Sequence, residues 1–307
     1  MSQTRLTIGS RGSPLALAQA RMVATALEKA HGWNSGRVAI LTVKTSGDRI
    51  QDRPLAEVGG KALWTKELDL ALLAGATHAS VHSMKDVESD RPDSLRIAAM
   101  LPRADIRDRL IGAASIADLP HGARVGSSSP RRAAQLRRLR PDLELVSIRG
   151  NVDTRLAKLA AGEVDATLLA AAGLIRLGRD EIGVAIEPDA MLPAPSQGAI
   201  GIECRADDAT TAALLSAIDH VDTHQAVLAE RAFCRALGGT CHSPVAAMAR
   251  IEGAEMAFTC EILSEDGSER LTENARFAVG DLDAPAALAR QMLAAAPPSI
   301  RRLFEGR

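Results

Sequence analysis

The stretch Ile8-Gly9-Ser10-Arg11-Gly12-Ser13-Pro14 decides the fold, because a strand-like apolar run ends here and a serine–proline pair opens a helix. A second stretch, Val125-Gly126-Ser127-Ser128-Ser129-Pro130, repeats this plan of strand, glycine, serine-rich turn and proline-started helix. We interpret the recurrence as two related α/β halves. Each half would place a helix N-terminus, with its free backbone N–H groups, at a shared cleft.

The first two thirds of the chain alternate between strand-like and helix-like stretches. Strands are predicted over residues 6–9, 38–43, 79–82, 123–126, 143–148 and 166–170, and helices are predicted to begin at Pro14, Lys61 and Pro130 and after the cap residue Asn151. Alternation of this kind is typical of parallel sheets with helices on both faces. In the first helix, the spacing of Leu15, Ala18, Met22 and Ala26 predicts the buried face.

The C-terminal part of the chain has a different pattern. Strand-like runs cover residues 245–251, 255–263 and 270–279, and a helix is predicted over residues 284–296. Glu252-Gly253 and Asp266-Gly267 separate the runs, and the second pair is a strong hairpin signal. The predicted class is therefore α/β, with one α/β domain over residues 1–101 and 196–217, a second over residues 102–195, and a small α+β domain over residues 218–307.

Composition excludes several classes of protein. With 46% hydrophobic and 24% charged residues, the 307-residue chain is typical of a packed globular protein, and its net charge of −1 gives no sign of a nucleic-acid or membrane partner. Residues 1–6 lack the features of a secretory signal, and no apolar run is long enough to span a membrane. The four cysteines lie far apart with no CxxC pair, as expected of a reduced cytoplasmic protein.

Residues 124–158 form a basic segment, with nine Arg or Lys side chains against three acidic ones. Arg131 and Arg132 fall in the first turn of a predicted helix, where the dipole already favours an anion, so a purely structural role for two cations is unfavourable there. Arg149 follows a strand and Arg155 lies one turn into the next helix, at the sheet edge where ligands bind. These four arginines are predicted to bind an anion, whereas Arg137, Arg138 and Arg140 are interpreted as a solvated face. With no Walker or GxGxxG pattern, a nucleotide is not indicated.

His82, Lys85 and Asp86 crowd the end of another predicted strand. A carboxylate at such a site can stabilise a developing cation or handle a proton. The spacing fits equally well a surface pair of Lys85 with Asp86 and a histidine that is simply part of the core.

Cys241 lies in a glycine-rich loop, Leu237-Gly238-Gly239-Thr240-Cys241-His242-Ser243-Pro244. A thiol in this setting is a candidate nucleophile or attachment point. The other cysteines, Cys204, Cys234 and Cys260, follow strand or helix patterns and are predicted to be small core residues. Adjacent Cys241 and His242 without further paired ligands lack the usual spacing of a zinc site, so no metal is expected.

Together these segments resemble the porphobilinogen deaminase (hydroxymethylbilane synthase) family. The matching stretches run in family order over nearly the whole chain: residues 9–17, 58–61, 81–86, 126–132, 148–151 with 154–156, 197–199 with 201–203, and the Cys241 loop. Any one piece is unspecific, whereas the combination is highly specific.

The resemblance implies a transferase of tetrapyrrole (heme) biosynthesis that joins four porphobilinogen molecules head to tail and releases four molecules of ammonia. It implies two α/β domains like type II periplasmic binding proteins and a third domain that carries the cofactor. That cofactor is dipyrromethane, made from two substrate units and held by a thioether to Cys241. A cytoplasmic monomer is expected, with porphobilinogen and the growing polypyrrole chain as its only partners.

The resemblance also implies roles for individual residues. Asp86 would stabilise the cationic pyrrole formed when ammonia leaves, with help from Lys85. Cofactor binding would involve Cys241, Lys85, Ser127, Ser128, Ser129, Arg131 and Arg132; substrate binding would involve Arg11, Ser13, Arg149, Arg155, Arg176 and Gln197; Lys61 and Trp64 would belong to an active-site lid.

Five positions depart from the family pattern. Glu57 stands where lysine is common in the lid, Trp64 where phenylalanine is common, Thr240 where glycine is common, and Pro195-Ser196 where valine–glycine is common. None of these removes a catalytic side chain, but Glu57 reverses a charge in the lid.

Two other functions would fit parts of this sequence. A two-lobed solute receptor or sensor would bind anions without catalysis. The missing signal peptide argues against a periplasmic receptor, no helix-turn-helix segment suggests a regulator, and neither needs a third domain with Cys241. A cysteine-nucleophile transferase would need an oriented base, and His242 is the only neighbouring candidate.

Overall fold

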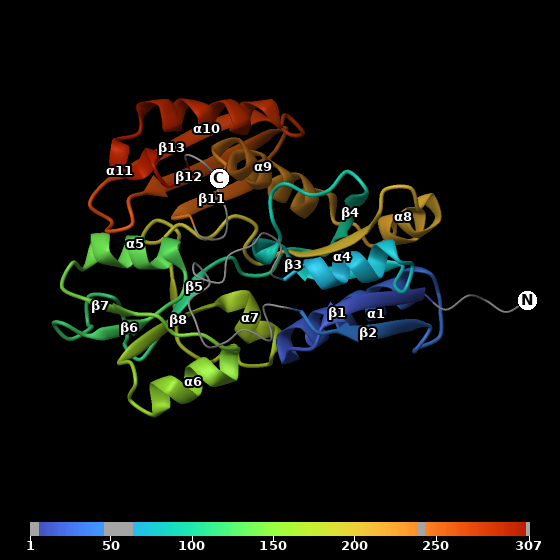
Figure 1. Cartoon of the computed structure of the whole chain (residues 1–307), viewed down its shortest axis with the longest axis horizontal. Coiled ribbons are helices and arrows are strands. Elements are labelled where there is room, and N and C mark those ends of the chain that lie inside the picture. The colour runs from blue at the N-terminus through green and yellow to red at the C-terminus, as the bar shows by residue number, and fades with distance from the viewer. Residues whose placement is uncertain (1–5, 46–63, 239–242, 305–307) are drawn as a thin grey trace, which may run out of the picture. The chain divides into compact units, whose positions relative to one another are not determined.

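The computed structural model describes residues 6–45, 64–238 and 243–304, which fold as two compact units (Figure 1). Of the described residues, unit 1 comprises 6–45, 64–104 and 198–224, and unit 2 comprises 105–197, 225–238 and 243–304. Unit 1 holds one sheet and unit 2 holds two. The division into three domains with the boundaries given above stays a prediction.

The sheet of unit 1 has five strands in the order β2-β1-β3-β10-β4. The strands are β1 (Leu6–Arg11), β2 (Val38–Val43), β3 (Ala79–Ser83), β4 (Leu95–Met100) and β10 (Ile200–Arg205). Its helices are α1 (Pro14–Ala30), α4 (Lys66–Leu73), α8 (Ala209–Ser216) and the short 3₁₀ helix η1 (Met84–Asp86). Strands β2, β1 and β3 are parallel, and β10 runs antiparallel to β3 and β4.

The first sheet of unit 2 repeats this arrangement in the order β7-β6-β8-β5-β9. Its strands are β5 (Asp108–Ile111), β6 (Arg124–Gly126), β7 (Glu144–Val146), β8 (Ala166–Ala170) and β9 (Val184–Ile186), and its helices are α5 (Pro130–Leu139), α6 (Val152–Ala160) and α7 (Ala171–Arg176). Strand β6 with α5 occupies the place that β1 with α1 has in unit 1. The two related α/β halves predicted from the serine–proline repeat are thereby confirmed.

The predicted parallel sheets each contain one antiparallel strand, the fourth in the order of each five-stranded sheet. Both exceptions have the same cause. Strand β5 follows the point where the chain enters unit 2 after residue 104, and β10 follows the point where it returns to unit 1 after residue 197. A strand that enters from the other unit is not delivered by a β-α-β crossover, so its direction is not bound to that of its neighbours.

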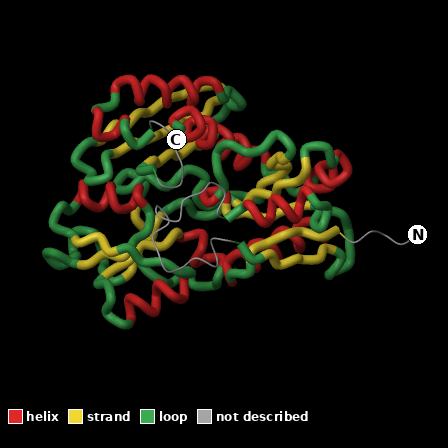
Figure 2. The backbone as a smooth tube through the Cα atoms, viewed as in Figure 1, coloured by secondary structure: helices red, strands yellow, loops and turns green. Residues whose placement is uncertain are grey.

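The C-terminal sheet of unit 2 is an antiparallel meander of β11 (Val245–Glu252), β12 (Glu255–Leu263) and β13 (Arg270–Ala278), as predicted. Helices α9 (Val221–Leu237) and α10 (Asp283–Ala295) pack on one face around Phe233 and Phe258, and α11 (Pro298–Arg301) follows. In Figure 2 the yellow strands of this sheet lie beside the red helix α10. The other face of β11 packs Ala246 and Met248 on Leu192, which precedes the return to unit 1.

The hairpin turn between β12 and β13 contacts α5. Gly267 has φ +73°, and a Cβ there would overlap the carbonyl oxygen of Ala134 in α5. Only glycine fits both requirements, so the Asp266-Gly267 signal reflects tertiary packing as well as the turn.

The buried face of α1 differs from the prediction. Gln19, Ala20, Val23, Ala24 and Leu27 are buried, whereas Met22 is 45% exposed. Alanines occur on every side of this helix, so hydrophobic spacing does not distinguish its faces. Of the helices in residues 6–45, 64–238 and 243–304, none has the length and apolar character that crossing a membrane requires.

Candidate active site

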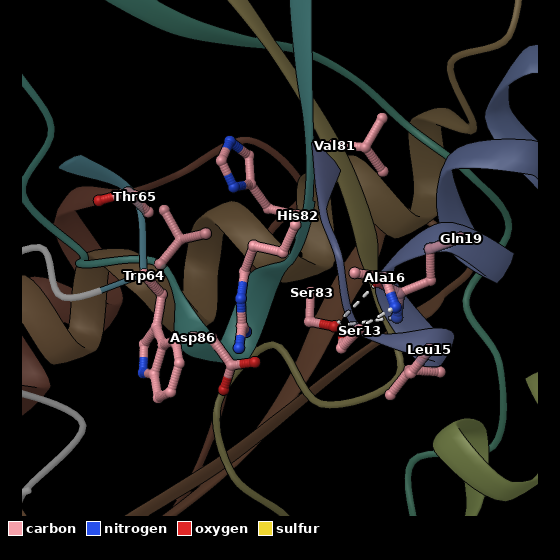
Figure 3. A pocket seen from close by; sticks show the side chains of 12 residues that line it. Ser13, Leu15, Ala16, Gln19, Trp64, Thr65, Val81, His82, Ser83 and Asp86 are labelled. Carbon is pink, nitrogen blue, oxygen red and sulfur yellow. Dashed lines mark hydrogen bonds between the residues drawn. The ribbon is translucent and has the colours of Figure 1, made fainter. Parts of the chain in front are cut away.

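A pocket lies at one edge of the unit 1 sheet (Figure 3). Because β1 and β3 are adjacent and parallel, their carboxyl ends meet there. The lining comes from the end of β1 (Arg11), the start of α1 (Ser13, Leu15, Ala16, Gln19), the start of α4 (Trp64, Thr65), and β3 with η1 (Val81, His82, Ser83, Asp86, Val87). The structure thus brings together four of the predicted site residues: Arg11, Ser13, Trp64 and Asp86.

Each of these side chains is placed by local structure. Ser13 caps α1, its hydroxyl accepting a hydrogen bond from the Ala16 amide at 3.3 Å. Asp86 ends η1, directly after β3, with Lys85 beside it in the same turn. The Arg11 guanidinium carbon lies 4.0 Å from the centre of the Trp64 ring, a cation–π contact. In Figure 3 the Asp86 carboxylate and the Trp64 indole lie on the same side of the pocket.

The serine-rich turn of unit 2 opens α5. Ser129 caps the helix by accepting from the Arg132 amide at 3.4 Å, and Ser127 accepts from the Ser129 amide at 3.2 Å. The Ser128 hydroxyl donates to the carbonyl oxygen of Ile148. The three serines therefore shape this turn through their own hydrogen bonds.

Arg131 and Arg132 are buried in unit 2, each 2.7 Å from a different carboxylate oxygen of Asp108 at the start of β5. Gln197 donates to Asp108 Oδ1 at 2.9 Å and to the Ile106 carbonyl at 2.7 Å. Burial alone would raise the pKa of Asp108, but the two guanidinium groups outweigh it and hold that pKa below its usual range. Three predicted ligand-binding side chains thus converge on one carboxylate.

Asp108 was not predicted from the sequence. Arg131 and Arg132, at a helix start, were predicted to bind a ligand, whereas Asp108 provides an anion from within the protein. The ion pair joins Asp108 to residues more than twenty positions later in the chain, and no local pattern marks such a partner.

The remaining predicted arginines also lie in unit 2. Arg149 follows Ile148 after β7, and Arg155 donates from Nε to the Gly150 carbonyl at 3.0 Å. Arg176 ends α7, and burial lowers its pKa to about 10. In the basic segment, Arg138 is exposed, Arg140 pairs with Asp142 at 2.8 Å, and Arg137 donates to the Glu265 carbonyl.

Several predicted residues lie outside the described residues, namely Glu57, Lys61, Thr240, Cys241 and His242. The other three cysteines are buried thiols, which confirms their prediction as core residues. Burial raises the pKa of Cys260 to about 12, so it remains a thiol at neutral pH. Within the described residues, no group of three or more His, Cys, Asp or Glu side chains is arranged to hold a metal ion.

Comparison with known proteins decides the family. Residues 6–213 match the family model described as porphobilinogen deaminase, dipyrromethane cofactor binding domain, and residues 224–294 match that of the C-terminal domain. The chain belongs to the porphobilinogen deaminase family. It is 60% identical over 305 residues to the porphobilinogen deaminase of Sphingopyxis alaskensis, covering 97% of this chain and 96% of that one. It is 52% identical over 270 residues to that of Paracoccus denitrificans, covering 87% and 86%.

Among solved structures, a BvgS VFT2 domain of Bordetella pertussis matches with a TM-score of 0.39 and 15% identity over 69% of this chain and 84% of that one. A substrate-binding domain of a putative amino acid ABC transporter from Streptococcus pneumoniae matches with a TM-score of 0.43 and 13% identity over 69% and 90%. The expected class is confirmed by the strand orders and the elements: two five-stranded α/β sheets are followed by a C-terminal α+β part.

This porphobilinogen deaminase family member is an enzyme of tetrapyrrole synthesis with a dipyrromethane cofactor. The side chains of unit 2 fit such a polycarboxylate. Within the described residues, Arg131 Nε and Arg132 Nε are buried donors with no acceptor. Burial partly desolvates the Arg176 guanidinium, and a nearby anion stabilises a desolvated cation.

Proposed function

We propose that the chain joins four porphobilinogen molecules head to tail into hydroxymethylbilane and that the pocket of unit 1 is where ammonia departs. The supporting observation is that this pocket holds an acid, Asp86, together with a guanidinium, Arg11. Porphobilinogen carries carboxylates and an aminomethyl group, so its site has to accommodate both negative and positive groups. A receptor of the same architecture would bind the molecule and return it unchanged.

In each addition, the C–N bond of the protonated aminomethyl group breaks and nitrogen leaves with the bonding pair as ammonia. Positive charge then spreads over the pyrrole ring, and Asp86 offsets it in a partly enclosed site where a fixed carboxylate acts more strongly than water. The new C–C bond releases a ring proton, which Asp86 or its neighbour Lys85 can pass to solvent.

Cys241 would hold the cofactor, which when bound would offer a free pyrrole carbon for the first unit to join. We assign Arg131, Arg132, Ser127, Ser128 and Ser129 to its carboxylates, with Lys85 beside Asp86. Arg11, Ser13, Arg149, Arg155, Arg176 and Gln197 are assigned to substrate and growing chain, since the planar guanidinium fork matches a carboxylate. Lys61 and Trp64 are assigned to a lid.

We further propose that the enzyme is a cytoplasmic monomer without nucleic-acid or membrane partners. The net charge of −1 supports the lack of nucleic-acid and membrane partners, the absence of a CxxC pair supports the cytoplasmic location, and the monomer is what the family resemblance implies.

Incubation of the purified enzyme with porphobilinogen tests the function. We expect one molecule of tetrapyrrole and four of ammonia for every four molecules of porphobilinogen consumed, measured by mass spectrometry and ammonia assay. Recovery of unchanged porphobilinogen bound to the protein would instead indicate a receptor.

Chain elongation tests the arginines of unit 2. Arg149→Leu or Arg155→Leu removes one charge-assisted contact, worth about 1.5–3 kcal/mol, from the growing chain. Partly elongated enzyme should therefore accumulate in intact mass spectra during turnover. Arg138→Leu is the matched control, because Arg138 is exposed in the same basic segment. An unchanged distribution of intermediates in the first two variants would contradict the assignment of Arg149 and Arg155 to the growing chain.

A further inference from the structure

The largely enclosed guanidinium of Arg91 lies behind the pocket of unit 1. Arg91 lies between η1 and β4, and its side chain is 10% exposed. Its Nε and Nη2 donate to the two carboxylate oxygens of Glu203 at 2.9 and 2.7 Å, and Nη2 also donates to Asp69 at 2.6 Å. Nη1 donates to Glu88 at 3.3 Å. The bidentate contact with Glu203 fixes the plane of the guanidinium.

Arg91 also contacts the residue from which α4 begins. Its Nη1 donates to Thr65 Oγ1 at 3.2 Å, and that hydroxyl donates to Glu88 Oε2 at 3.0 Å. A threonine at this position ordinarily accepts a hydrogen bond from the first turn of its helix. Among the described residues, Thr65 makes no such cap bond. Its hydroxyl instead accepts a hydrogen bond from Arg91 and donates one to Glu88.

Arg91 and its partners Asp69, Glu88, Glu203 and Thr65 form the Arg91 cluster. Two of these partners connect the cluster to the pocket. Thr65 lines the pocket next to Trp64, which contacts Arg11, whereas Arg91 does not line it. A second route runs through Glu203, whose Oε2 lies 3.4 Å from Nε2 of the pocket residue His82. The His82 and Glu203 side chains are both nearly inaccessible to solvent, so neither has room to move away from the cluster.

We propose that Arg91 is a positioning residue that holds Thr65, and with it Trp64, so that the indole orients the Arg11 guanidinium toward a carboxylate of the substrate. An aromatic face restricts a guanidinium without using its N–H donors, and only a correctly turned guanidinium binds a carboxylate at two points. The inference rests on the proposed function, since porphobilinogen supplies the carboxylate.

The test compares Arg91→Leu and Arg91→Lys in a Trp33→Phe background, where Trp64 is the remaining tryptophan. For Arg91→Leu, KM for porphobilinogen should rise about tenfold, the effect of losing one oriented contact, with kcat little changed. The fluorescence emission of Trp64 should shift at the same time. Lysine keeps the charge but lacks the fork, so Arg91→Lys should give a smaller change in both readouts.

Arg205→Leu is the matched control. Arg205 ends β10 in the same unit and pairs with Asp207 and Asp208, but it does not line the pocket. It should change neither KM nor Trp64 emission.

Folded Arg91→Leu enzyme with unchanged KM and unchanged Trp64 emission would overturn the proposal. If this variant does not fold, Thr65→Val tests the same link, since it removes the hydroxyl and keeps the side-chain volume; unchanged emission there would also overturn it. Failure of the unmodified enzyme to consume porphobilinogen would refute the proposed function instead, and Trp64 emission would still decide whether Arg91 positions the indole.

Discussion

Replacing Asp86 by asparagine should lower kcat by roughly 10²–10³-fold while the protein remains folded. The amide has the shape of the carboxylate without its charge. What is lost is compensation of the positive charge that develops on the pyrrole as ammonia departs. Because this charge appears only after binding, KM should change much less than kcat. Steady-state rates of porphobilinogen consumption give both values.

Asp90→Asn is the control for this experiment, because Asp90 is an exposed carboxylate close in sequence that does not line the pocket. It should leave kcat unchanged. If Asp86→Asn retained a kcat near that of the unmodified enzyme, the role assigned to this carboxylate would be refuted.

Replacing Asp108 by asparagine should destabilise unit 2 by about 3–5 kcal/mol, the usual cost of removing one partner from a buried ion pair. Without the carboxylate, the Arg131 and Arg132 guanidinium groups would remain buried without their counter-charge. Urea unfolding of the full chain, followed by circular dichroism, measures the change.

Asp165→Asn is the matched control, because Asp165 pairs with Arg124 at 3.0 Å in the same unit but both side chains are 41% exposed. Exposed ion pairs contribute little to stability, so this variant should unfold almost like the parent protein. Equal stability of the two variants would contradict the importance of the buried cluster.

Acid should weaken the Asp108 cluster. Its folded-state pKa lies below that of an unfolded aspartate, about 3.9, so its contribution is complete above that pH and is lost as the pH falls further. Asp108→Asn lacks this carboxylate, so its stability should fall less steeply in acid.

Features that are local in sequence were predictable. A serine and a proline after a strand and glycine identify a helix start, and the structure places Ser13 and Ser129 as the caps of α1 and α5. Arg11 ends β1 and Asp86 comes just after β3, and the shared carboxyl edge of these parallel strands brings both into one pocket.

Features that depend on distant partners were not predictable. Asp108 beside Arg131, and Glu203 beside Arg91, join strands to residues far away in the chain. Likewise, the antiparallel direction of β5 and β10 follows from where the chain passes between units, for which a strand's own residues carry no signal. In the alanine-rich helix α1, the faces differ too little in hydrophobicity for the sequence to identify the buried one.

The mass of the intact purified protein tests the central claim most directly. We expect an excess over the sequence mass equal to two porphobilinogen units, each less one molecule of ammonia, and we expect that excess to disappear in Cys241→Ser and to persist in Cys204→Ser. An active enzyme whose mass equals that of its sequence, or a Cys241→Ser protein that still carries the excess, would contradict the attachment of dipyrromethane to Cys241.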